Sequence, residues 1–163
     1  MDPAIADVER QVALLLRLAD RNRRRSRRLE GTLERSAYLA LGRLIDQGPA
    51  GINEIADHLR LDASTVTRQV LQMEAAGYVS RGRDEADGRR SVIAATTTGI
   101  AAWEATRRAR ADVYAEVLSA WEPDDLQVLA RSLTRLNASL DASLDASARP
   151  APLQAAGAES SSR

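Results

Sequence analysis

Residues 51–99 read GINEIADHLRLDASTVTRQVLQMEAAGYVSRGRDEADGRRSVIAATTTG, and the order of patterns in this stretch decides the fold. The first pattern is a short helix that we predict to start at Asn53, because asparagine favours the N-cap position. Glu54 then places a carboxylate at the positive end of the helix dipole. Ile55 and Leu59 fall on one face, as a period of 3.6 residues requires.

A second helix follows after a tight turn. Asp62 is a second N-cap residue, and the apolar residues Val66, Val70 and Met73 share the face that we expect to be buried. Gly77 ends this helix, because the residue after a helix often adopts a positive φ. Two short helices joined in this way predict a helix-turn-helix.

The other faces of the second helix carry small or polar side chains. They are Ser64, Thr65, Thr67, Arg68 and Gln69. Short hydroxylated side chains let a helix approach a DNA groove closely, and arginine can bond guanine with two parallel hydrogen bonds. The alternative is that these residues only solvate an exposed helix. Next to a second capped helix and a basic hairpin, we interpret them as contacts to double-stranded DNA.

A β-hairpin is predicted between Tyr78 and Thr96, with the turn dipeptide Asp87-Gly88 in its connection. Gly51 and Ile52 are predicted to form a short strand that pairs with it. Four arginines cluster in the hairpin against three acidic residues: Arg81, Arg83, Arg89 and Arg90, with Asp84, Glu85 and Asp87.

A basic hairpin beside a helix-turn-helix predicts a wing that lies along a minor groove, whose negative potential attracts arginine. We expect Arg89 to enter or border that groove. Arg90 points to the other side of an extended chain, so we place it nearer a phosphate or solvent. Asp87 can alternatively pair with Arg89 and stiffen the loop, and both roles are compatible. The predicted fold class is mainly α with a small β-hairpin wing, a winged helix-turn-helix.

This stretch resembles the MarR (multiple antibiotic resistance regulator) family of bacterial transcription factors. The resemblance rests on LDASTVTRQVLQMEAAGYV for the DNA-reading helix and DEADGRRSV for the wing. The family's Asp-x-Arg wing signature is met by Asp87 and Arg89, and its threonine and glycine at the next helix by Thr96 and Gly99. One departure is Ala95, where the family commonly has leucine. The resemblance extends weakly over residues 5–145.

The resemblance implies a homodimer that binds palindromic DNA, usually as a repressor, and that is often released by a small ligand. It also implies a ligand pocket between the dimerisation helices and the DNA-reading part. Tyr38, Trp103 and Tyr114 are the aromatic candidates for lining such a pocket, with ordinary core or interface packing as the alternative for each.

The two ends of the chain carry apolar seams with alternating spacings of three and four, as in coiled coils. The seams are Ile5, Val8, Val12, Leu15 and Ala19 at one end and Leu126, Leu129, Leu133, Leu136 and Leu140 at the other. We predict one domain over residues 5–145. Residues 33–99, called the reading head below, bind DNA, and residues 5–30 and 100–145 form dimerisation helices. Residues 146–163, rich in Pro, Ala, Ser and Gly, are predicted to be a flexible tail.

Composition restricts the other function classes. The chain has 163 residues, no cysteine and one histidine, His58. It therefore has no thiolate ligand and only one imidazole for a metal site or for acid–base catalysis. There is no phosphate-binding glycine loop or nucleophile elbow. We therefore predict no enzyme, no cofactor and no metal site. No signal peptide or apolar membrane span is visible, which predicts a cytoplasmic protein without a membrane partner. The second hypothesis is a winged-helix scaffold that binds proteins rather than DNA.

The formal net charge is zero, yet all 23 basic residues are arginine. Residues 21–28, RNRRRSRR, concentrate the positive charge. A solvated helix face, contact with phosphates and pairing with acids of a partner chain all fit this run.

Overall fold

The structure is a computed structural model that describes residues 2–84 and 87–148, without the side chains of residues 23–25 and 146–148. Internal contacts divide the chain into two units, residues 1–116 and 117–163, and each unit is described by itself. Helices predominate, with one antiparallel hairpin, so the predicted fold class is confirmed. The described elements are α1 (Pro3–Arg25), the 3-10 helix η1 (Arg27–Leu29), α2 (Arg35–Gln47), α3 (Ile52–Leu59), α4 (Ala63–Ala75), β1 (Val79–Arg83), β2 (Ser91–Ala95), α5 (Thr97–Val117) and α6 (Pro123–Ala148).

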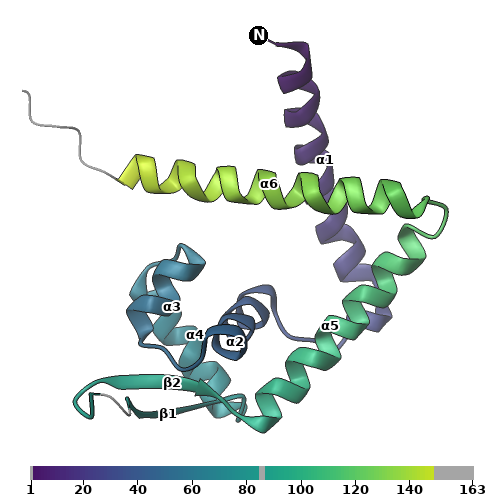
Figure 1. The fold of residues 1–163 in the computed structure, drawn as a ribbon. Helices are drawn as coiled ribbons and strands as arrows, with labels where there is room; N and C mark the ends of the chain where they lie inside the picture. The colour runs from purple at the N-terminus through teal and green to yellow at the C-terminus, as the bar shows by residue number, and fades with distance from the viewer. Residues whose placement is uncertain (1, 85–86, 149–163) are drawn as a thin grey trace, which may run out of the picture. The chain divides into compact units, whose positions relative to one another are not determined.

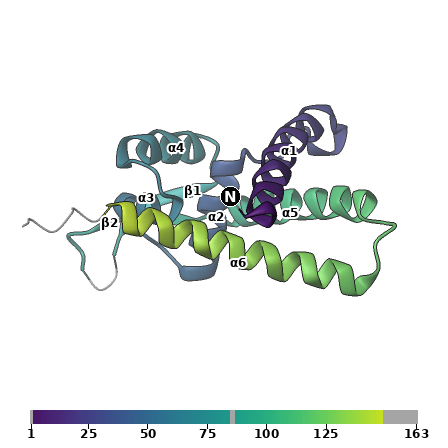
Figure 2. The same cartoon turned by 90° about the horizontal axis from the view of Figure 1, so that it is seen from above.

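The core of the reading head lies between α2, α3, α4 and the hairpin. Its fully buried side chains come from every one of these elements: Leu41, Ile55, Val66, Val70 and Ile93. Met73 is also buried, so the predicted inner face of α4 is confirmed. In both views the hairpin extends past α3, and α5 starts at the opposite end of the hairpin (Figures 1 and 2).

The helix α3 starts two residues earlier than the sequence predicted. Its N-cap is Gly51 rather than Asn53, and Glu54 Oε2 accepts a hydrogen bond from the Gly51 backbone N–H at 2.7 Å. The prediction missed this start because Glu54 caps the helix from inside its first turn, as in half of a capping box. Arg60, with φ of 54°, closes α3 in the left-handed region, and Asp62 caps α4 as predicted.

The wing is a two-stranded antiparallel hairpin in which Val79 pairs with Ala95 and Arg83 with Ser91. A third segment joins it at Ala50, whose backbone exchanges hydrogen bonds of 3.0 and 2.8 Å with Ile93. The predicted pairing through Gly51 and Ile52 is wrong, because both residues are already committed to the start of α3.

The junction of α4, the wing and α5 depends on Gly77, Thr96 and Gly99. Gly77 has φ of 74°, and the Tyr78 N–H donates to the Met73 carbonyl at 2.8 Å, which is the backbone pattern of a Schellman stop. The Thr96 hydroxyl donates to the Gly77 carbonyl at 2.6 Å and accepts from the Gly99 N–H at 3.0 Å. A Cβ on Gly99 would lie 2.0 Å from the Tyr78 carbonyl oxygen, so only glycine permits this approach.

The segment that leads into α2 is bonded to α5. The buried Thr106 hydroxyl accepts a hydrogen bond from the Leu33 N–H at 3.0 Å. Nearby, Arg28 pairs with Glu116 at 2.6 Å. One arginine of the basic run thus pairs with an acid of its own chain, while the side chains of residues 23–25 lie outside the described residues.

The predicted apolar seams lie on long helices with much exposed surface. On α1, Ile5, Val8 and Leu15 are each at least half exposed. On α6, in the second unit, Leu133 and Leu140 are exposed. The helix α6 continues to Ala148, three residues into the predicted tail, and the rest of that tail lies outside the described residues.

Candidate nucleic-acid interface

The hydroxyl groups at the start of α4 are hydrogen-bonded to its N-cap residue or to its first residue. The hydroxyls of Ser64 and Thr65 both donate to the Asp62 carboxylate, and the Thr65 backbone N–H adds a third bond at 2.8 Å. These hydrogen bonds, led by that of Ser64, hold the pKa of Asp62 well below its ordinary value. The Thr67 hydroxyl donates to the Ala63 carbonyl at 2.7 Å. Because each hydroxyl hydrogen is engaged, these groups offer acceptor lone pairs to a bound partner.

Arg68 and Gln69 differ in their surroundings. Arg68 is exposed and makes no side-chain hydrogen bond or ion pair with the described part of the chain. Gln69 is half-buried, and its Oε1 atom is buried without a hydrogen-bond donor among the described residues. Arg68 is therefore the cation that α4 leaves available.

Three of the four wing arginines are bonded inside the reading head. Arg81 pairs with Glu74 at 3.5 Å, and Arg83 donates to the Gly88 carbonyl at 2.7 Å. Arg90 pairs with Glu54, and its Nη1 atom lies 3.7 Å from Asp84 Oδ2. The exposed side chain of Arg89 has no partner within the described residues. Asp87 accepts from the Arg89 backbone N–H at 3.1 Å, so it orders the loop without occupying the guanidinium.

The pairing of Arg90 with Glu54 was not predicted, since the two residues are far apart in the sequence and no sequence pattern links them. The Gly51 N–H and the Arg90 guanidinium lower the pKa of Glu54, and Glu54 in turn raises the pKa of Arg90. Both groups are therefore fully charged at neutral pH. That Arg90 also contacts DNA stays a prediction.

Two of the three aromatic candidates form a stack between α2 and α5. The rings of Tyr38 and Trp103 lie 5.5 Å apart between centroids with an interplanar angle of 10°. Arg107 lies over the Trp103 ring at 5.6 Å and Arg110 over the Tyr38 ring at 4.4 Å, both at cation–π distance. Tyr114 is exposed and lies eleven residues beyond Trp103 on α5, about 16 Å by helical rise. Within one chain, Tyr114 therefore lies apart from the stack of the other two rings, and the role of all three in lining a ligand pocket stays a prediction.

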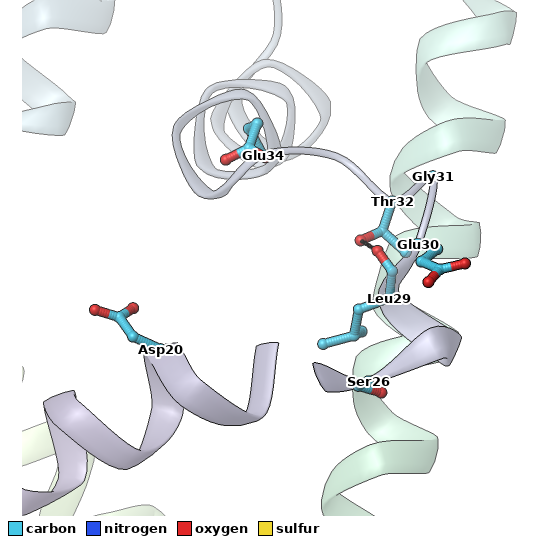
Figure 3. Close-up of a pocket in the computed structure, with 7 residues that line it drawn as sticks. All are labelled: Asp20, Ser26, Leu29, Glu30, Gly31, Thr32 and Glu34. Atoms are coloured by element: carbon cyan, nitrogen blue, oxygen red, sulfur yellow. Dashed lines mark hydrogen bonds between the residues drawn. The ribbon is translucent and has the colours of Figure 1, made fainter. Parts of the chain in front are cut away.

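A cavity of about 450 Å³ lies where α1, η1 and the start of α2 meet (Figure 3). Carboxylates of Asp20, Glu30 and Glu34 line it, together with Ser26, Leu29, Gly31 and Thr32. Asp20 is within 3.5 Å of Arg35. This lining is polar and contains none of the predicted aromatic residues.

Sequence reasoning missed the partners that hold the site together. Thr106 could have been found, since it is the polar member of an inward face of α5 that also includes Ala102 and Val113. Arg107 and Arg110 also follow Trp103 at helical spacings of four and seven. No local signal connects Glu54 to Arg90, because that contact exists only after the wing has folded against α3.

The comparisons with known proteins agree with this geometry. The MarR family model matches residues 33–91, which include α3, α4 and most of the wing. The uncharacterized HTH-type transcriptional regulator YxaD of Bacillus subtilis (strain 168) is 35% identical over 112 residues, which are 69% of this chain and 78% of YxaD.

Solved structures show the same fold. A MarR family protein from Bacillus stearothermophilus has a TM-score of 0.71 at 25% identity, over 86% of this chain and 97% of that one. Bordetella bronchiseptica BpsR, whose DNA binding is regulated by 6-hydroxynicotinic acid, has a TM-score of 0.60 at 19% identity, over 77% of this chain and 91% of BpsR.

Within residues 2–84 and 87–148, none of the helices combines the length and the apolar character needed to cross a bilayer. The same family is indicated by the helix-turn-helix, by the wing with Asp87 and Arg89, and by the match to YxaD. The chain belongs to the MarR family and is a DNA-binding transcriptional regulator.

Proposed function

We propose that this regulator is a homodimeric repressor that reads a palindromic operator with α4 in the major groove and with Arg89 at the minor groove. The observation that carries the proposal is the pair of free cations on the reading head. Arg68 and Arg89 are exposed and have no partner among the described residues, whereas Arg81, Arg83 and Arg90 are engaged. An unpaired guanidinium is available to phosphates and base edges without first breaking an internal bond.

The proposed DNA contacts are the predicted residues Ser64, Thr65, Thr67, Arg68, Gln69 and Arg89. Arg90, the remaining predicted residue, is already paired with Glu54. Arg68 is assigned to a base edge, because arginine on this helix can bond guanine O6 and N7 together. The hydroxyls of Ser64, Thr65 and Thr67 are assigned to base-edge donors, since their own hydrogens already bond to Asp62 or to the Ala63 carbonyl. Gln69 makes at most a partial contact because it is half-buried.

The exposed seams of α1 and α6 support the dimer. Unpaired apolar stripes such as Ile5, Val8 and Leu15 are costly in water, and a second copy would cover them. A two-fold dimer presents two reading heads related by symmetry, which favours a palindromic operator. The helices within residues 5–30 and 100–145 are thus proposed to form the interface, in one domain spanning 5–145. Because a bacterial repressor works where the DNA lies, we place the protein in the cytoplasm.

Ligand release is proposed by likeness to BpsR, whose DNA binding responds to 6-hydroxynicotinic acid. Within the described residues, two candidate sites for such control are the Tyr38–Trp103 stack and the acidic cavity near Asp20. That Tyr114 lines a ligand pocket stays a prediction.

The test is selection of bound fragments from random DNA, followed by affinity measurement on the selected operator. A palindromic consensus is expected, and Arg68→Ala should weaken specific binding by about 1–3 kcal/mol while relaxing one position in each half-site. Arg108→Ala, which removes an exposed charge on α5, is the control and should leave the preference unchanged. Selection without any consensus, or unchanged binding by Arg68→Ala, would refute the assignment.

A further inference from the structure

Ion pairs join the wing to the helices of the reading head at two places in the described chain. Arg81 on β1 pairs with Glu74 near the end of α4, and Arg90 pairs with Glu54 in the first turn of α3. The two pairs differ in their place along the hairpin. Arg81 lies opposite Ile93 in the strand register, whereas Arg90 lies beyond Ser91, outside the paired strands. The ion pair of Arg90 is therefore the one closer to the tip of the wing.

A backbone bridge holds the base of the wing to the rest of the reading head. The Ala50–Ile93 bridge holds β2 at Ile93, three residues after Arg90 in the sequence and about 10 Å away along an extended strand. A two-stranded hairpin is only marginally stable by itself, so its outer part takes its direction from side-chain contacts. Arg89, the free cation, lies in that outer part.

Glu54, the partner of Arg90, is held in place by contacts that do not involve the wing. Glu54 is held by its hydrogen bond to the Gly51 N–H at 2.7 Å, in the first turn of a helix whose inner face is buried through Ile55. On the wing side, Asp84 lies 3.7 Å from Arg90, and the Asp84 N–H donates to the Arg90 carbonyl at 2.9 Å. Arg90 thus bridges a carboxylate of α3 and one of its own hairpin.

We propose that Arg90 is a positioning residue: through its ion pair with Glu54 it fixes the wing against α3 and so sets where Arg89 meets the minor groove. The inference rests on the proposed DNA-binding role of Arg89. It assigns the specificity of the wing to a residue pair inside the protein, with Arg90 acting through Arg89 and not on the DNA.

The sign of one substitution separates this role from a direct phosphate contact. Glu54→Gln removes a negative charge from the reading head, which by electrostatics alone strengthens the attraction to DNA. Glutamine also serves in the capping box, so α3 keeps its cap. Loss of the ion pair leaves the wing less fixed, and the proposal therefore expects weaker specific binding despite the more positive surface.

The experiment measures affinity for the selected operator, and for a copy with G·C in place of A·T at the flanks, over a range of salt. The variants are Glu54→Gln, Arg90→Ala and their double variant. The matched control is Glu74→Gln, which removes the carboxylate paired with Arg81. Glu54→Gln should weaken operator binding by roughly three- to tenfold and reduce the preference for A·T flanks. The control should bind as tightly as the wild type or more tightly. The double variant should bind no more weakly than Arg90→Ala, because both changes break one interaction.

Two results would overturn the proposal. In the first, Glu54→Gln matches Glu74→Gln in affinity and flank preference, and the ion pair then does not position the wing. In the second, Arg90→Ala weakens binding to every sequence with a shallower salt dependence while Glu54→Gln binds like the wild type, which marks Arg90 as a direct phosphate contact.

A measurement without DNA keeps this inference separate from the proposed function. The chain has no cysteine, so a nitroxide label on Gly88→Cys reports from the wing alone, at a site with open space around the new side chain. The label should be more mobile with Glu54→Gln than with Glu74→Gln. Equal mobility refutes the positioning role even if operator binding is intact. A wild-type protein without sequence preference refutes the proposed function and leaves this comparison valid.

Discussion

The exposed side chain of Arg89 has no partner within the described residues, so its substitution should act on DNA binding and not on folding. Arg89→Ala should lower affinity for all sequences and weaken the preference for A·T-rich flanks. The slope of log affinity against log salt should become shallower by about 0.9 for each phosphate charge that Arg89 neutralises. The melting temperature should barely change. Normal affinity with a lower melting temperature would show that Arg89 serves the loop.

Asp62 makes the stability of α4 depend on pH. Its pKa in the folded chain is lowered by the hydrogen bonds of Ser64 and Thr65, so the folded state favours the carboxylate. A lowered folded pKa gives stabilisation that is complete above the ordinary pKa of about 3.9 and is lost as the pH falls towards the folded value. The melting-temperature advantage of the wild type over Asp62→Asn should therefore shrink once the pH drops below about 4.

Thermal unfolding from pH 7 downwards measures this effect. Asp57→Asn on α3 is the control, since this exposed carboxylate caps no helix. A wild-type advantage over Asp62→Asn that stays constant down to the lowest pH would contradict the role of the ionised cap.

At the scale of elements, the close approach of α5 to Tyr78, the residue before β1, depends on Gly99. Alanine is favoured over glycine by about 1 kcal/mol inside a helix, so a position without contacts would gain stability from Gly99→Ala. Here the new Cβ would lie 2.0 Å from the Tyr78 carbonyl oxygen, and the backbone must shift. We expect Gly99→Ala to lower the free energy of unfolding by about 1–3 kcal/mol, as other overpacked sites do.

Denaturant unfolding provides the measurement for this glycine. Gly82→Ala in β1 is the matched control, because its Cβ would meet open space. The Thr96 hydroxyl bonds across the same junction, so the destabilised variant should also bind the operator more weakly. Equal stability of Gly99→Ala and the wild type would mean that the junction adapts without cost.

The sequence predicted elements whose signals are local. The helix α4 is determined by signals close together in the sequence: Asp62 at its start, Gly77 after its end and the spacing of its apolar residues. The structure confirms the N-cap and the buried face of Val66, Val70 and Met73. The start of α3 was misplaced because Asn53 is a better N-cap than Gly51, and only the contact of Glu54 with the Gly51 N–H decides between them. The candidate DNA contacts Arg68 and Arg89 came from residue type and position, whereas the freedom of their side chains is a tertiary property.

At the scale of the whole molecule, the exposed seams predict an obligate dimer. Light scattering at micromolar concentration should give twice the chain mass. Replacing Leu133 and Leu136 of α6 with aspartate should dissociate or unfold the protein, because unpaired charge in an apolar contact is costly. The double variant Ser132→Asp and Ser139→Asp adds the same charge at exposed polar positions and should remain dimeric. A stable, soluble wild-type monomer would contradict the prediction.

The stacked rings of Tyr38 and Trp103 also give the protein an optical reporter of its own. Two aromatic chromophores held nearly parallel at 5.5 Å are close enough to couple electronically, so the near-ultraviolet circular dichroism should carry a signal that depends on their mutual orientation. The only other tryptophan, Trp121, is exposed, so its emission should lie at longer wavelength, and Trp121→Phe removes it. In that variant, any effector or operator that moves α5 against α2 should change the colour or intensity of Trp103 fluorescence. The motion could then be followed in solution without an attached dye.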